Sequence, residues 1–177
     1  AELWRNGCLQ FYLACLHADF AAELLGQEFL QITALDSIAV WLVNEPERVE
    51  DHLLHPETIS QLVAFFKHVS SSSLAAALES FMKMVTKSRR LNRSLAVGGL
   101  AAELSDRLNS PEANPLARLN MLKLTKAIYD ANTRSKQLAS ETNLPHQLRQ
   151  LLESEREGEL VLVKQMAQAL LVSLGTT

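Results

Sequence analysis

A short phrase that returns after 43 residues constrains the fold of this chain more than any other feature. The sequence reads ALDS at 34–37 and ALES at 77–80, and an apolar run with helical spacing follows each phrase. The surrounding pattern returns as well: a long helix, a short helix, a break, another helix and a loop. Leu35, Leu78 and Met121 occupy equivalent positions in successive copies. A period of about 40–47 residues with two or three helices is typical of armadillo and HEAT arrays.

Helical periodicity extends along the whole chain, whereas the alternation expected of strands is missing. With 6 glycines and 5 prolines among 177 residues, only short loops are expected. We therefore predict an all-α fold, an armadillo/HEAT-like superhelix in which neighbouring units bury each other's apolar faces. The expected helices cover residues 3–17, 28–44, 46–54, 59–66, 74–85, 90–97, 100–108, 116–132, a shorter stretch to 142, 148–152 and 160–174.

The repeating pattern divides the chain into units. Full units are expected at residues 27–69, 70–113 and 114–158, all within one armadillo-like domain. Residues 1–26 are interpreted as the end of a preceding unit, and 159–177 as a partial last unit. Because the chain begins in the middle of a unit, we expect it to be a fragment of a longer protein. Its ends would then expose apolar helix faces, so pairing of two copies through an end helix is one alternative function.

Composition narrows the class of partner. The net charge of −3 gives no general attraction to nucleic acid or to an anionic membrane, and no long apolar run suggests a membrane span.

Cys8 and Cys15 share one face of a helix, and we expect buried free thiols in a reducing compartment, the cytoplasm. Trp4 and Trp41 are expected to lie in the core, and the alternative for Trp41 is packing on a neighbouring unit.

Motifs for catalysis are missing from the sequence. It contains no Gly-rich phosphate loop, His-Arg-Asp loop, Asp-Phe-Gly motif or Gly-x-Ser-x-Gly elbow, so we expect no enzyme activity and no cofactor. His52 and His55 have a spacing that could hold a metal on a helix. Pro56 interrupts the helix there, which favours two histidines at a helix end and no metal site. The alternating carboxylates from Glu153 to Glu159 are interpreted as a solvated loop.

Two basic clusters and one helix face are candidates for partner binding. The clusters lie at equivalent turns one period apart, so they would share one edge of the superhelix and could contact an acidic or phosphorylated segment. The alternative is that they complement the dipoles of helix C-termini. The third helix of each unit would supply the concave face that usually binds partners. The cluster residues are Arg89, Arg90, Arg93, Arg134 and Lys136, with Lys87 beside them, and the third-helix residues are Gln61, Glu103, Arg107 and Arg149.

Several longer strings resemble one family of kinases. They are TALDSIAVWL (33–42), ERVEDHLL (47–54), LNMLKLTKAIYDAN (119–132) and VLVKQMAQALL (161–171). From about Gln27 onward the chain resembles the C-terminal, non-catalytic, armadillo-like region of the septation-initiation and mitotic-exit network kinases of fungi and the MAP kinase kinase kinase epsilon proteins of plants.

This resemblance implies a regulatory and targeting role. In that family a Ras-like small GTPase recruits the kinase to the spindle pole or its equivalent. We therefore expect the chain to bind such a GTPase or a spindle-pole scaffold, and to lie in the cytoplasm, at the spindle pole body or at the division site. The alternatives are a homodimerisation module and an unrelated armadillo or HEAT adaptor, such as part of a transport receptor.

Overall fold

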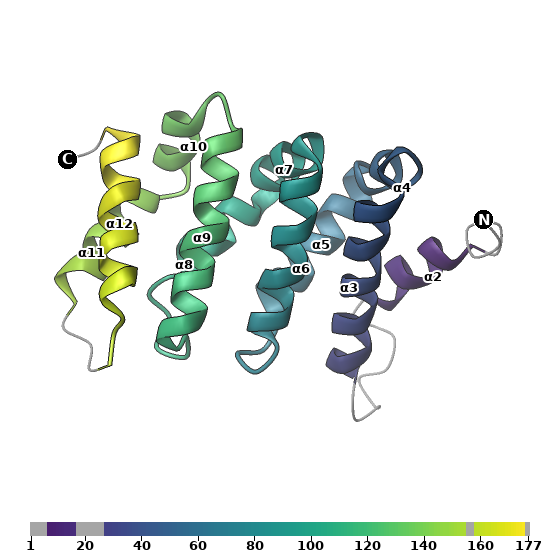
Figure 1. The fold of residues 1–177 in the computed structure, drawn as a ribbon, viewed down its shortest axis with the longest axis horizontal. Coiled ribbons are helices and arrows are strands. Elements are labelled where there is room, and N and C mark those ends of the chain that lie inside the picture. Colours follow the sequence, from purple (N-terminus) through teal and green to yellow (C-terminus); the bar gives the residue numbers. More distant parts are fainter. Residues whose placement is uncertain (1–6, 17–26, 155–157, 176–177) are drawn as a thin grey trace.

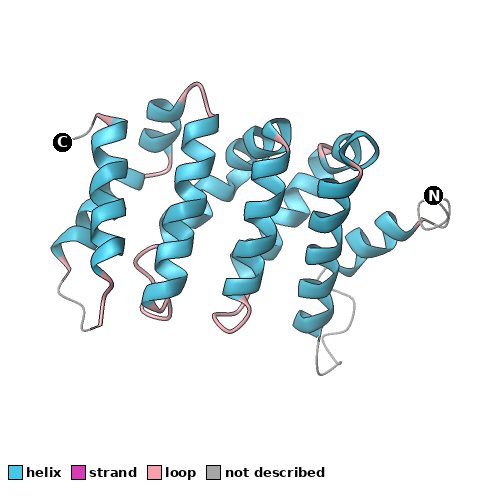
Figure 2. Cartoon of the chain, viewed as in Figure 1, coloured by secondary structure: helices cyan, strands magenta, loops and turns pink. Residues whose placement is uncertain are grey.

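The computed structural model describes residues 7–16, 27–154 and 158–175. Within these ranges the chain consists of helices joined by short turns and loops, with no strand, which confirms the predicted all-α class (Figure 2). None of the helices in the described ranges is long and apolar enough to cross a membrane.

Long helices stand side by side in one layer of the described structure (Figure 1). Each packs against the next, and all run in the same direction. Parallel neighbours of this kind require the chain to return between them, and the shorter helices provide that return. The long helices are α3 (Gln27–Asn44), α6 (Leu74–Lys87), α9 (Pro115–Ala131) and α12 (Val161–Leu174).

The shorter helices lie behind this layer or at the end where the long helices finish (Figure 1). A long helix, a short helix and a second-layer helix follow one another repeatedly, in the order that the sequence predicted. Since α11 packs on both α8 and α12, the contacts do not choose one set of unit boundaries, and those stay a prediction. The second-layer helices are α2 (Cys8–Cys15), α5 (Pro56–His68), α8 (Ala101–Arg107) and α11 (Leu144–Glu153), and the short ones are α4 (Pro46–Leu53), α7 (Arg89–Leu95) and α10 (Ser135–Glu141).

Local sequence explains where several helices begin. Proline is suited to the first turn of a helix, because the backbone N–H that it lacks has no partner there in any case. Asn114 caps α9 by accepting a hydrogen bond from the N–H of Ala117 at 2.7 Å, and Ser88 caps α7 in the same way. The prolines that start helices are Pro46, Pro56, Pro115 and Pro145.

The core explains why the sequence phrase returns. Leu35, Leu78 and Met121 are 0%, 2% and 0% exposed, respectively. They lie on α3, α6 and α9, which pack against one another in sequence. Between the layers, the rings of Phe66 and Phe81 meet edge to face with centroids 5.6 Å apart. The repeated leucine positions are therefore the places where each long helix is buried in the array.

The expected helices 90–97 and 100–108 are separated by the glycine pair at 98–99, but no loop forms there. The pair lies inside a single wide turn, η1 (Ala96–Leu100), that joins α7 to α8 through a kink at Gly99, whose φ is 124°. A Cβ at Gly98 would lie only 2.5 Å from the side chain of Ile59 on α5. The pair thus bends the helix and lets α5 approach closely, rather than ending the helix in a loop.

The cysteines and tryptophans were expected to be buried, and the structure describes three of these four residues. Cys8 and Cys15 are free but half-buried rather than buried, because α2 packs on α3 with only part of its surface. Trp4 lies outside the described residues. Trp41 is half-buried, packs against the core and meets the ring of Tyr12 on α2 edge-on, with centroids 6.2 Å apart.

Truncating a buried side chain of α9 should destabilise the array far more than truncating an exposed one. Leu122 is 0% exposed and Leu116, on the same helix, is 59% exposed. We expect Leu122→Ala to lower the free energy of unfolding by about 2–5 kcal/mol, and Leu116→Ala by less than about 0.5 kcal/mol. Urea unfolding followed by circular dichroism measures both. Equal losses would mean that α9 does not pack as described.

Candidate functional site

Many polar side chains bond residues about one repeat length away in the sequence, and Arg107 on α8 is the clearest case. Its guanidinium donates to the carbonyls of Phe66 and Val69 at 2.8 and 3.0 Å, at the C-terminal end of α5. It also lies 5.5 Å from the centre of the Phe66 ring. Arg107 therefore bonds backbone carbonyls at the end of α5, and whether it also contacts a partner stays a prediction.

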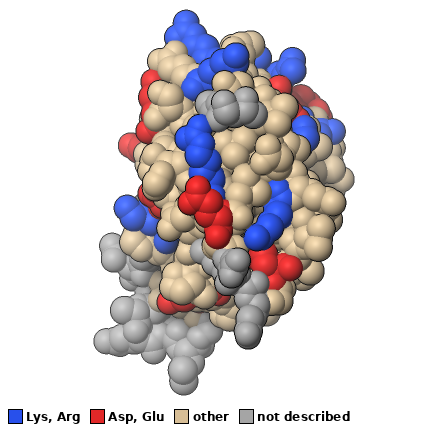
Figure 3. All heavy atoms as spheres, turned by 90° about the vertical axis from the view of Figure 1, so that its left-hand side faces the viewer, with Lys and Arg blue, Asp and Glu red and all other residues tan. Residues whose placement is uncertain are grey.

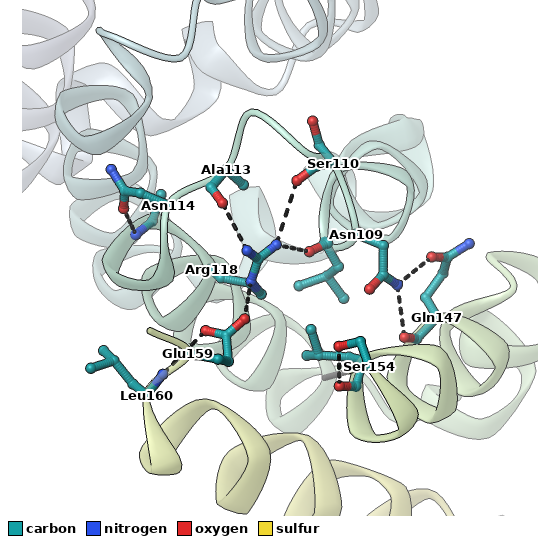
Figure 4. A network of polar contacts seen from close by, with 12 residues as sticks. Asn109, Ser110, Ala113, Asn114, Arg118, Gln147, Ser154, Glu159 and Leu160 are labelled. Carbon is teal, nitrogen blue, oxygen red and sulfur yellow. Dashed lines mark hydrogen bonds and ion pairs between the residues drawn. The ribbon is translucent and has the colours of Figure 1, made fainter. Parts of the chain in front are cut away.

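A buried ion pair between Arg118 and Glu159 is the most enclosed of these contacts. The two side chains are 5% and 3% exposed and meet at 2.7 Å. Arg118 also donates to the carbonyls of Leu108 and Ala113 at 3.0 and 2.8 Å, so it holds the loop before α9 and the segment before α12 together (Figure 4). The expectation of a solvated loop is therefore wrong for Glu159, because the segment that carries it folds back onto α9.

The two basic clusters lie along the same edge of the array, where the long helices finish and the turns lead into α7 and α10 (Figure 1). Arg90 does not stand free there. Its guanidinium bonds Glu50 at 3.0 Å and Asp51 at 2.9 Å, on α4 of the adjoining unit, and these acceptors raise the pKa of Arg90 above its ordinary value. Because Arg90 and Asp51 are largely exposed and Glu50 is only partly buried, such pairs contribute little to stability.

The remaining basic residues differ in how they are engaged. The guanidinium of Arg93 donates to the carbonyl of Ala131 at 3.3 Å, the last residue of α9. Contact with a helix C-terminus was the alternative that the sequence allowed for the basic clusters. The helix that Arg93 contacts is α9, whereas Arg93 itself lies on α7. Lys136 lies beside Gly175 at the C-terminal end of α12. Arg89 and Arg134 are exposed at the edge.

The other third-helix candidates lie on separate second-layer helices and do not form one cluster with the basic edge. Gln61 on α5 is half-buried and lines a hollow between α3 and α5. Glu103 on α8 faces Lys67 at 3.7 Å, and Arg149 on α11 is exposed. Whether any of them contacts a partner stays a prediction.

The serine run before α6 bonds acidic residues instead of capping the helix. Ser73 precedes α6 without a side-chain cap, although serine is a residue type that often caps helices. The hydroxyl of Ser70 donates to Glu28 at 2.5 Å, and Ser71 donates to Glu112 at 3.0 Å. Burial alone would raise the pKa of Glu28, but hydrogen bonds from Ser70 and Ser73 and the nearby Arg107 charge together lower it. The run therefore links α3 to α6 and α6 to the loop before α9.

The two histidines that could hold a metal lie between two helices: His52 is in the last turn of α4 and His55 directly precedes α5. His52 and His55 line a shallow hollow against α2. Among the residues that the structure describes, no group of three or more His, Cys, Asp or Glu side chains could hold a metal ion.

A groove on the long-helix layer was missed by sequence reasoning. It has a volume of about 840 Å³, runs along α6 and is bordered by α3 and α9. Its signal in the sequence was the small and apolar residues on the outer stripe of α6, which a buried helix face would equally well explain. We call it the α6 groove, and its lining residues are Val43, Ala75, Ala76, Leu78, Glu79, Met82, Lys83, Thr86, Lys87, Asn120 and Lys123.

Breaking the Arg118–Glu159 pair from one side should be costly. Arg118→Ala leaves a buried carboxylate and two backbone carbonyls without their donor, so we expect a loss of about 3–5 kcal/mol in the free energy of unfolding. The double variant R118M/E159L removes both charges and should lose less. Thermal and urea unfolding compare the two. A loss below about 1 kcal/mol for Arg118→Ala would show that the pair is exposed in solution.

Comparison with known proteins places the whole chain within larger kinases and division proteins. No protein-family model matches the chain. It is 44% identical to MAP3K epsilon protein kinase 1 of Arabidopsis thaliana, in an alignment of 179 positions that covers 98% of this chain. It is 29% identical to cytokinesis protein sepH of Emericella nidulans over 97% of its length, and 25% identical to cell division control protein 7 of Schizosaccharomyces pombe over 96%.

The chain spans only 12% of the first two of these proteins and 15% of the third. The similarity therefore concerns one region of each relative rather than the whole protein. Because the alignments nonetheless cover almost all of this chain, the resemblance expected from its sequence is confirmed. The chain is homologous to one region shared by the MAP3K epsilon protein kinases of plants and, at lower identity, by fungal septation kinases.

Proposed function

We propose that the chain is a non-catalytic protein-binding and targeting region of a kinase that acts in septation or mitotic exit. The names of the relatives support the setting, since they include protein kinases, a cytokinesis protein and a cell division control protein. The observation that carries the proposal is the layered array of helices, whose long faces suit contact with another protein. We propose further that the array is an armadillo-like superhelix with units at 27–69, 70–113 and 114–158.

We propose that the chain itself is not catalytic, and the contacts of its polar side chains support this. Two enclosed charged groups, Arg118 and Glu159, bond each other, and Arg118 also bonds backbone carbonyls. A catalytic site needs polar groups that converge on a cavity and are left available to a substrate. The contacts of these groups between units fit a structural role instead.

The partner that we propose is a Ras-like small GTPase or the scaffold that carries it. Binding would place the parent kinase at the spindle pole body or division site, and the chain itself would contribute no chemistry. This choice rests on the kinase resemblance rather than on a contact in the structure.

Homodimerisation is the second candidate, and one surface favours it. α12 stands at the end of the described array and exposes Val161, Leu162 and Val172. Seen from that end, most of the surface is uncharged (Figure 3). An apolar end of this kind could pair with a second copy of the chain.

Light scattering separates the two candidates. The chain should be monomeric alone and should form a one-to-one complex with a GTP-loaded Ras-like GTPase. We expect the GDP-loaded form to bind at least about tenfold more weakly, a difference of about 1.4 kcal/mol. A stable dimer with no nucleotide-dependent complex would contradict the proposal and favour homodimerisation.

A further inference from the structure

The α6 groove has an apolar floor. Leu78 lies buried at its base and Met82 half-buried beside it. Ala75 and Ala76 expose only methyl groups along the outer face of α6, and Val43 is exposed at the border with α3. Small side chains on the central helix, between larger neighbours, leave a trough in the layer. Such a trough can take apolar side chains from a partner, and the flexible thioether of methionine adapts to them.

The rim of the groove is positively charged. Three lysines line it against a single glutamate, although the chain as a whole has a net charge of −3. Lys83 is paired with Asp36 at 2.9 Å and lies 3.5 Å from Glu79. Lys87 on α6 and Lys123 on the neighbouring α9 are both exposed, and neither forms an ion pair with the described residues. Two lysines therefore face the groove without an acidic partner.

We propose that the α6 groove binds an acidic peptide segment of a protein partner, with carboxylates on Lys87 and Lys123 and apolar side chains on the floor. Charge complementarity selects this occupant, because a basic rim around an apolar floor matches a segment that carries both groups. A nucleic acid would use the lysines but would leave the apolar floor unmatched. The proposal rests on the protein-binding function above and names the surface and the chemistry that it would use.

Methionine methyl NMR reports on this groove directly. The chain has 4 methionines, of which Met82 lines the groove, Met84 and Met121 are buried and Met166 lies on α12. The probe is a short synthetic peptide that alternates Glu or Asp with Leu or Phe, and its match replaces each acidic residue by Lys. The acidic peptide should shift the Met82 methyl and leave Met166 in place. A shift at Met166 alone, equal binding of both peptides, or no binding would overturn the proposal.

Charge reversal at the rim gives the matched test. K87E/K123E should weaken binding of the acidic peptide about tenfold, and most at low salt. R89E/R134E changes the net charge equally but lies on the basic edge, so it should leave the affinity unchanged. All four side chains are exposed, so we expect both variants to fold, and unfolding curves of each variant check this. Loss of binding in R89E/R134E, with none in K87E/K123E, would assign the acidic segment to the basic edge and contradict the groove.

The same variants keep this proposal separate from the proposed function. A Ras-like GTPase that binds K87E/K123E as tightly as the original chain would leave the targeting role standing and remove the groove from it. Binding of the acidic peptide at Met82, without any GTPase complex, would support the groove and contradict the GTPase as partner.

Discussion

Side-by-side packing of the long helices is the interaction on which the rest of the structure depends. Leu35, Leu78 and Met121 are buried on consecutive helices that contact each other. A single unit has no other surface on which to bury those residues, so each needs its neighbour. The inter-unit bonds of Arg107 and Arg118 follow from the same stacking, because it brings the polar ends of one unit against the loops of the next.

The sequence was sufficient to predict the helices but not how most charged residues are used. Apolar periodicity located the long helices to within a few residues, since it reflects burial along a single helix. The roles of Arg107 and Glu159 depend instead on backbone carbonyls and side chains about one repeat away. A pattern within one helix contains no information about such partners, so a buried arginine and a solvated one look alike. Arg93 shows the same limit, because the helix end that it contacts, Ala131, lies 38 residues further along the chain.

The α6 groove could not be predicted for a related reason. The alanines on α6 and the lysines on α6 and α9 form one surface only when the helices pack side by side. By contrast, the resemblance to division kinases came from long strings of helix residues, which similarity over almost the whole chain confirms. In this chain the residues that identify the relatives are therefore largely those that build the array, while the surfaces for partners must be found in three dimensions.

Hydrogen exchange of the backbone amides tests the stacked array most directly. Stability in such an array is approximately a sum of unit and nearest-neighbour terms, so helices with a neighbour on both sides should open least often. We predict that amides of α6 and α9, each packed between two long helices, exchange slowest, and that those of α2 and α12 exchange fastest. Equal protection along the whole chain, or strongest protection in α12, would contradict this account.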